Sequence, residues 1–253
     1  MKKFFAIASL FALTLSACAE KEQEGEQQGK GRVDISLVTS AEVADTRANI
    51  SCTTPEWADF ALTIEGGRDY KAEYASIAEF EDNYLYFGSY TASVKAGDVR
   101  KEGFGSVAFE GSETFDVEPR ANTNVTITAT IANAVVKVET TENFERYFAE
   151  GHTFTLTTAA GNEFDVTAQE ELLFIAPAEF SVVGTAVKQA AQSGKEGVTV
   201  TLPKFKQSDV KAQTLYTVKF DVETAGSATL NITLNETLVE SIDIEQELND
   251  NAQ

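Results

Sequence analysis

Apolar and polar residues alternate along most of the chain beyond residue 32. In the segments VDISLV, FALTIE and NVTITATIA every second residue is apolar, and the residues between are mainly Thr, Asp, Ser or Glu. This period of two is typical of half-buried β-strands, whose successive side chains point to opposite faces of a sheet. The pattern predicts strands over residues 33–38, 60–65, 85–94, 114–117, 124–132, 135–139, 154–157, 164–167, 172–175, 198–202, 215–222, 228–234 and 238–244.

Helical periodicity is rare. Only the short segments 141–148 and 180–192 are candidates for helices. Strands that recur every eight to twelve residues or so, with turn residues such as Gly66-Gly67 between them, are typical of β-sandwiches. The lack of βαβ alternation argues against Rossmann-type folds and the cofactors that they bind.

The predicted strands are too many for one sandwich. A natural break lies near Asn133, where one long β-segment ends and another begins. The sequence therefore predicts an all-β chain with two tandem antiparallel β-sandwich domains of transthyretin-like or immunoglobulin-like type. Domain one would cover residues 33–132 and domain two residues 133–247, with a short tail over 248–253.

Residues 1–17 have the pattern of a lipoprotein signal peptide. Lys2 and Lys3 precede an apolar run of about fourteen residues, which is shorter than the roughly 20 residues needed to span a bilayer. The following segment LSAC resembles a bacterial lipobox, which implies cleavage before Cys18 and acylation of its sulfur and its amine. Two or three acyl chains would hold the protein firmly on a membrane. The alternative is an ordinary secretory signal that leaves Cys18 as a plain thiol.

Residues 18–32 form an acidic tether. Glu20, Glu22, Glu24 and Glu26 lie in it, with no apolar residue beyond Ala19. Such a segment cannot bury enough surface to offset the entropy lost on ordering, so we expect it to be solvated. An acidic segment behind a lipidated cysteine resembles the surface-export signal of Bacteroidetes lipoproteins, which implies an outer-membrane anchor and the cell surface. The alternative is a plain spacer on a lipoprotein that faces the periplasm.

The charge of the chain limits its partners. There are 20 Lys and Arg against 40 Asp and Glu, a net charge of −20, and loss of Lys2 and Lys3 with the signal peptide gives 18 − 40 = −22. So acidic a body repels phosphate backbones and anionic membrane faces. We therefore expect no nucleic-acid partner.

Candidate catalytic chemistry is sparse. His152 is the only histidine, and its position between Gly151 and a strand favours a solvated loop end. If Cys18 is acylated, Cys52 is the only other cysteine, which excludes an intramolecular disulfide; a Cys52–His152 nucleophile would require the two residues to meet. No GxSxG, P-loop or EF-hand pattern occurs. We expect a non-enzymatic protein with no cofactor and no metal.

Four aromatic residues are candidates for ligand contact. Trp57, the only tryptophan, lies just before a strand, where it would either cap the first core, which we favour, or stack on a sugar or a protein surface. Tyr84, Tyr86 and Tyr90 recur at even spacing. We expect these three on one face, as part of the core or as an exposed aromatic stripe.

Three segments resemble an uncharacterised family of Bacteroidetes lipoproteins that is known only as a domain of unknown function. They are ADFALTIEG, FGSYTASVKAGD and FEGSETFDVEPRANTNVTITATIANAVVKVETTENFERYF, in this order. The resemblance covers about residues 33–148, although YFGSY lacks the Leu-Pro of the family's first motif. It implies a fimbrillin-like architecture, with paired transthyretin-like sandwiches behind a lipoprotein signal.

These features predict a cell-surface lipoprotein that acts as a non-catalytic, adhesin-like module for a glycan or protein ligand. The alternative is a fimbria-like structural subunit or anchor that associates with itself. Arg47 follows the first predicted strand in a polar loop, and a related arginine in fimbrillins marks where a protease removes that strand. Its removal would open a groove that a strand of a neighbouring subunit could fill.

Overall fold

The computed structural model describes residues 29–44, 50–149, 151–167, 170–188, 197–223 and 228–243. The predicted signal peptide, Cys18, the predicted tether up to residue 28, Arg47 and the predicted tail over 248–253 lie outside the described residues. Within these ranges the chain forms strands, three 3-10 turns and a short helix, α2 (Glu142–Tyr147), which confirms the all-β prediction. Among the described helices, none is long and apolar enough to cross a membrane.

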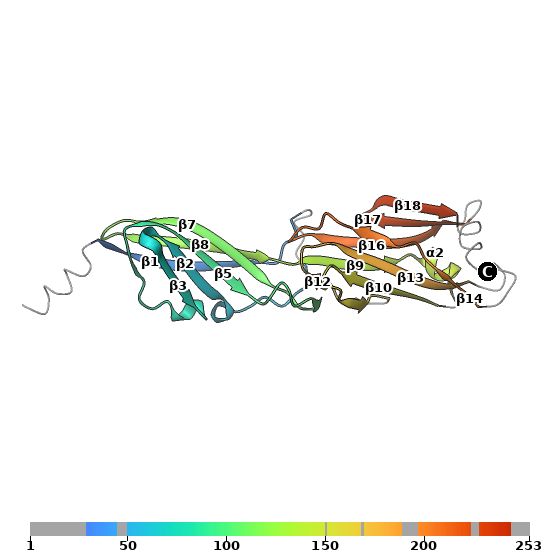
Figure 1. Cartoon of the computed structure of the whole chain (residues 1–253), viewed down its shortest axis with the longest axis horizontal. Coiled ribbons are helices and arrows are strands. Elements are labelled where there is room, and N and C mark those ends of the chain that lie inside the picture. The colour runs from blue at the N-terminus through green and yellow to red at the C-terminus, as the bar shows by residue number, and fades with distance from the viewer. Residues whose placement is uncertain are drawn as a thin grey trace, which may run out of the picture.

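The first domain is one seven-stranded sheet that curls around a core (Figure 1). Its strands are β1 (Lys30–Ser40), β2 (Ala61–Gly66), β3 (Tyr70–Tyr74), β4 (Tyr84–Tyr86), β5 (Gly88–Ala96), β7 (Phe109–Val117) and β8 (Asn122–Ile131). They lie in the order β3-β2-β5-β7-β8-β1-β4. The 3-10 turns are η1 (Trp57–Asp59), η2 (Gly67–Asp69) and η3 (Ile77–Glu79).

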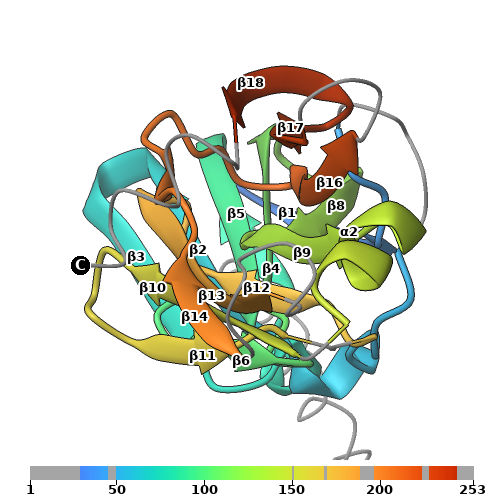
Figure 2. The same ribbon diagram turned by 90° about the vertical axis from the view of Figure 1, so that its right-hand side faces the viewer.

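The second domain consists of two sheets around a second core. One contains β10 (His152–Thr158), β11 (Glu163–Asp165), β13 (Phe180–Lys188), β14 (Val198–Thr201) and β15 (Phe205–Gln207). The other contains β9 (Ala134–Thr140), β12 (Leu173–Ile175), β16 (Leu215–Glu223), β17 (Thr229–Leu234), β18 (Thr237–Asp243) and, from the first domain, β6 (Gly103–Phe104). Figure 2 shows this domain end-on, with β16, β17 and β18 on one side and β10, β13 and β14 on the other.

Most neighbouring strands are antiparallel, as predicted, but each domain contains a parallel pair. β1 runs parallel to β8, and β9 runs parallel to β16. In both domains the first strand lies beside one that comes much later in the sequence, so a crossover rather than a hairpin links them. The alternation of apolar residues is the same for either strand direction, and the sequence pattern therefore did not reveal these pairs.

The segment 180–192 was predicted as a candidate helix, and this prediction is wrong over its described part. Residues 180–188 form β13, which hydrogen-bonds to β10, β14 and β15. Phe180, Val182 and Ala186 are buried at a spacing of two, whereas Val183 and Thr185 are half-buried on the other face. The Ala-rich composition concealed this strand period. The other candidate, 141–148, does contain a helix, α2, whose Thr141 Oγ1 accepts a hydrogen bond from the Phe144 N–H (3.2 Å).

The two domains lie end to end and are joined by specific contacts (Figure 1). Glu102 lies in the connection between β5 and β7 of the first domain. Its carboxylate accepts hydrogen bonds from Thr158 Oγ1 (2.6 Å) and Asn162 Nδ2 (2.7 Å) of the second domain. The backbone N–H of Ala176 donates to the same carboxylate (3.0 Å), and β6 pairs with β12. One carboxylate thus joins two segments of the second domain, the turn between β10 and β11 and the chain just after β12.

A buried amide lies where the chain passes from β8 to β9. Asn133 is fully buried; its Oδ1 accepts a hydrogen bond from the Ala108 N–H (2.6 Å) and its Nδ2 donates to the Ile175 carbonyl (3.4 Å). Because Asn133→Ala leaves the Ala108 N–H without this acceptor, we expect the free energy of unfolding to fall by about 1–3 kcal/mol. Urea denaturation measures the change, with the exposed Asn124→Ala as control. Equal midpoints for the two variants would contradict the prediction.

Candidate functional site

An exposed aromatic patch lies at the end of the first domain from which β1 starts (Figure 1). Tyr84 and Tyr86 of β4 pair with Arg32 and Lys30 of β1. The exposed fractions are 37% for Tyr84, 45% for Tyr86 and 47% for Phe87, while Leu85 between the tyrosines is buried. Tyr84, Tyr86 and Phe87 are called the β4 patch below. The sequence prediction missed Phe87, although its place directly after YLY in the sequence was a usable signal.

The chain beside the β4 patch supplies a cation. The Lys30 ammonium lies 5.2 Å from the centre of the Tyr86 ring, and the Phe87 N–H donates a hydrogen bond to the Gly29 carbonyl (2.8 Å). The Arg120 N–H donates to the Lys30 carbonyl (2.8 Å), which brings the exposed turn between β7 and β8 next to the same strand. Aromatic rings and basic side chains therefore gather where the described chain begins.

Tyr90 does not belong to this patch. The expected continuous strand is interrupted at Gly88, whose φ of 147° is readily adopted only by glycine, so β4 and β5 pair with different neighbours. Tyr90 is buried, and its ring lies against Tyr70 and Phe115. Its hydroxyl donates a hydrogen bond to the Tyr86 carbonyl (2.9 Å). The prediction that the three tyrosines share one face is wrong, and the role of Tyr90 is to support the strand that carries the patch.

Trp57 is exposed, which corrects the favoured interpretation that it caps the core. Its side chain lies in η1 and the residue is 40% accessible. The turn is fixed by hydrogen bonds: the Glu56 N–H donates to Asp59 Oδ2 (2.9 Å), and Ser76 Oγ donates to the Ala58 carbonyl (2.8 Å). The turn leaves Trp57 partly exposed, and Phe60, directly after the turn, enters the core instead.

Trp57 and the β4 patch lie at opposite ends of the first sheet. β2, which follows Trp57, begins opposite Lys95 of β5, whereas β5 starts at Gly88 directly after the β4 patch. About seven residues of strand, or roughly 24 Å, separate these two points. The structure therefore does not bring the four predicted aromatic residues together into a single site.

Cys52 lines a pocket between the domains. This cavity of about 420 Å³ is lined by Ser51, Cys52, Thr53, Gly105, Glu170, Glu171, Leu172 and Phe174. Cys52 is half-buried, and burial raises the pKa of its thiol, so the thiol is protonated at neutral pH and is a poor nucleophile.

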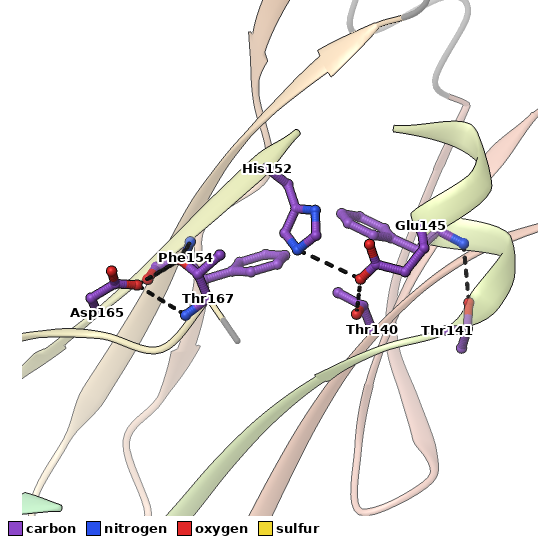
Figure 3. A network of polar contacts seen from close by, with 8 residues as sticks. Thr140, Thr141, Glu145, His152, Phe154, Asp165 and Thr167 are labelled. Atoms are coloured by element: carbon purple, nitrogen blue, oxygen red, sulfur yellow. Dashed lines mark hydrogen bonds and ion pairs between the residues drawn. The ribbon is translucent and has the colours of Figure 1, made fainter. Parts of the chain in front are cut away.

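His152 is not the solvated loop end that its sequence position suggested. It is the first residue of β10, its side chain is 13% exposed, and its ring lies against Phe144 and Phe154. Figure 3 shows its Nε2 directed at the Glu145 carboxylate, 3.6 Å away, which also accepts a hydrogen bond from the Thr140 hydroxyl. The ring anchors α2 to the strands beneath it.

Cys52 and His152 do not form a catalytic pair. β10 runs from His152 to Thr158, and Thr158 contacts Glu102 at the domain junction, where the Cys52 pocket also lies. The length of β10 thus places His152 about 20 Å from the junction. Among the described residues, no group of three or more His, Cys, Asp or Glu side chains is arranged to hold a metal ion.

This chain is similar in fold to solved structures of proteins from Bacteroidetes. A candidate polysaccharide-binding protein from Bacteroides thetaiotaomicron VPI-5482 is 9% identical with a TM-score of 0.41, and the match covers 85% of this chain and 100% of that chain. A candidate adhesin from Bacteroides ovatus is 8% identical with a TM-score of 0.41, covering 84% and 95%. The fimbrial anchor protein Mfa2 from Porphyromonas gingivalis is 9% identical with a TM-score of 0.38, covering 84% and 100%.

No curated protein matches the chain. A family model matches residues 29–250, which confirms the resemblance seen in the sequence motifs and extends it from the first domain through the second. The chain belongs to the family described as a domain of unknown function, DUF4493.

Proposed function

We propose that this protein is a non-catalytic, adhesin-like module, held on the outer surface of the outer membrane by a lipid on Cys18. The observation that carries the binding role is Trp57, whose ring is displayed to solvent from a hydrogen-bonded turn. A large exposed ring on a fixed turn loses little conformational entropy when it stacks on a sugar or packs into a protein pocket. The ligand is a glycan or a protein that meets this ring.

The absence of catalysis is part of the proposal. It is supported by the protonated Cys52 thiol and by the wide separation of that residue from His152. A broad screen for esterase and glycosidase activity tests this absence. Turnover of any substrate would contradict it.

The test of the binding role compares Trp57→Ala with wild type on a glycan array and on immobilised host glycoproteins. Since truncation of a central aromatic contact typically costs about 2 kcal/mol or more, we expect at least about a tenfold loss of affinity. The ring is partly exposed, so the melting temperature should change little. The control, Leu238→Ser, alters an even more exposed apolar residue on the second domain. Binding by the Trp57 variant that equals that of wild type would show that Trp57 does not contact the ligand.

A second candidate function, a fimbria-like subunit or anchor, is favoured by the environment of β1. This strand pairs with β8 along most of its length but with β4 only from Lys30 to Arg32. If a protease cut at Arg47 and β1 left, the edge of β8 would be open to a strand from another copy. Such an exchange would convert the module into a building block of a polymer.

A further inference from the structure

The β4 patch lies beside β1, the first described strand after the proposed anchor. Tyr84, Tyr86 and Phe87 are each more than a third exposed, and Tyr86 pairs with Lys30, near the start of the described chain. We propose that the β4 patch docks on the phosphate headgroups of the membrane that carries the protein. This inference rests on the proposed lipid anchor at Cys18.

The short tether holds the β4 patch near the lipid surface. Cys18 and Lys30 are 30 − 18 = 12 residues apart. Twelve residues reach at most about 40 Å when fully extended, so an acylated Cys18 would keep the start of β1 within this distance of the lipid surface. Tethering over such distances gives effective concentrations of about a millimolar. A contact that is weak between free molecules would therefore be well populated on the anchored protein.

The chemistry of the β4 patch fits a headgroup layer. Tyrosine rings are enriched at membrane interfaces because they present an apolar body and a polar hydroxyl. Phe87 adds a fully apolar ring, and the Lys30 ammonium, 5.2 Å from the Tyr86 ring centre, is available to a phosphate oxygen. The exposed Arg120 follows Pro119 in the neighbouring turn and adds a second cation.

The acidic character of the whole chain does not prevent this contact. At physiological salt, charges more than about 8 Å from the membrane are largely screened. Arg32 is paired with Asp34 (3.0 Å). The remaining cations, Lys30 and Arg120, are offset by Glu118 in the same turn and by the exposed Glu81 and Asp82 just before β4, so the local charges nearly balance. Docking is therefore driven by the aromatic rings, and it should depend little on whether the lipid is zwitterionic or anionic.

Docking assigns the two exposed aromatic surfaces to different partners. The β4 patch faces the anchor side, whereas Trp57, in the η1 turn before β2, stays free for a ligand. The second domain, which lies beyond the first (Figure 1), is then held away from the anchor.

The test uses the chain from residue 18 onward with Cys18→Ser, which retains every described residue and carries no acyl group. It is floated with phosphatidylcholine vesicles, with and without phosphatidylglycerol, at millimolar lipid. We expect flotation with both vesicles, and at least about a tenfold loss for Tyr84→Ser/Tyr86→Ser/Phe87→Ser. The single Phe87→Ser variant, which disturbs folding least, should give an intermediate loss. Melting curves confirm that each variant is folded.

The matched control is Leu238→Ser/Val239→Ser, which removes two similarly exposed apolar residues, 57% and 49% accessible, from β18 of the second domain. It should float like wild type. Failure of wild type to float, equal flotation of the triple variant, or an equal loss in the control would overturn docking. A triple variant that floats normally but loses ligand in the Trp57 assay would make the patch a ligand contact instead. An unmodified Cys18 in cells would overturn the anchor without changing these results.

Discussion

A chain that begins at Ala48, and so lacks β1, is expected to lose the stable monomeric first domain. β1 contributes a parallel ladder with β8 and the fully buried Val33, and its Ile35 and Leu37 pack against the same core. Burial of one such side chain stabilises by about 1.5–3 kcal/mol, and whole domains are stable by only about 5–15 kcal/mol. We expect either a fall of at least about 3 kcal/mol in the free energy of unfolding or association through the exposed edge.

Urea denaturation and size-exclusion chromatography of this truncated chain measure both effects. A truncated chain that remains a monomer with the midpoint of the full chain would contradict the prediction. Limited trypsin digestion then distinguishes the binding module from the fimbria-like subunit. The control is Arg47→Gln, which trypsin cannot cut at this position. Ordered polymers after cleavage at Arg47 would favour the fimbria-like subunit. A cleaved chain that stays monomeric and keeps β1 would favour the binding module.

Replacement of the proposed lipid attachment site is expected to remove the protein from the outer membrane almost completely. A single acyl chain gives only marginal membrane binding, whereas two or three give a stable anchor. Cys18→Ala removes every acyl chain at once. The contact of the β4 patch with lipid is too weak by itself to retain the free protein. Fractionation of cells that express the variant measures the change. Cys52→Ala, which alters the other cysteine, should remain anchored. Retention of the Cys18 variant in the outer membrane would refute the anchor.

The strand content was predictable because inward and outward residues alternate in most of the long strands. The pattern in VDISLV and NVTITATIA corresponds to β1 and β8, whose inward residues Val33, Val125 and Ile127 are buried. β13 was misjudged because Ala186 and the alanines that follow it favour a helix, and because Gly184 has no side chain to mark the inward face. Gly184 is needed there: an added Cβ would lie 2.7 Å from the Phe154 ring.

The sites were less predictable because exposure depends on contacts between distant segments. Tyr84, Tyr86 and Tyr90 all have even sequence spacing, but the turn at Gly88 sends Tyr90 into the core while Tyr84 and Tyr86 stay exposed. Glu102 is one of many acidic residues, and its role at the domain junction follows only from the approach of Thr158 and Asn162. No local pattern in the sequence distinguishes it from its solvated neighbours.

The central claim is that an acylated Cys18 displays the two domains outside the cell. The most direct measurement is protease treatment of intact native cells, followed by mass spectrometry of the N-terminal peptide that stays in the outer membrane. We expect a retained stub that begins at Cys18 with acyl groups on its sulfur and amine, and loss of the second domain from the cells. A chain that stays intact on treated cells, or an N-terminus without lipid, would contradict it.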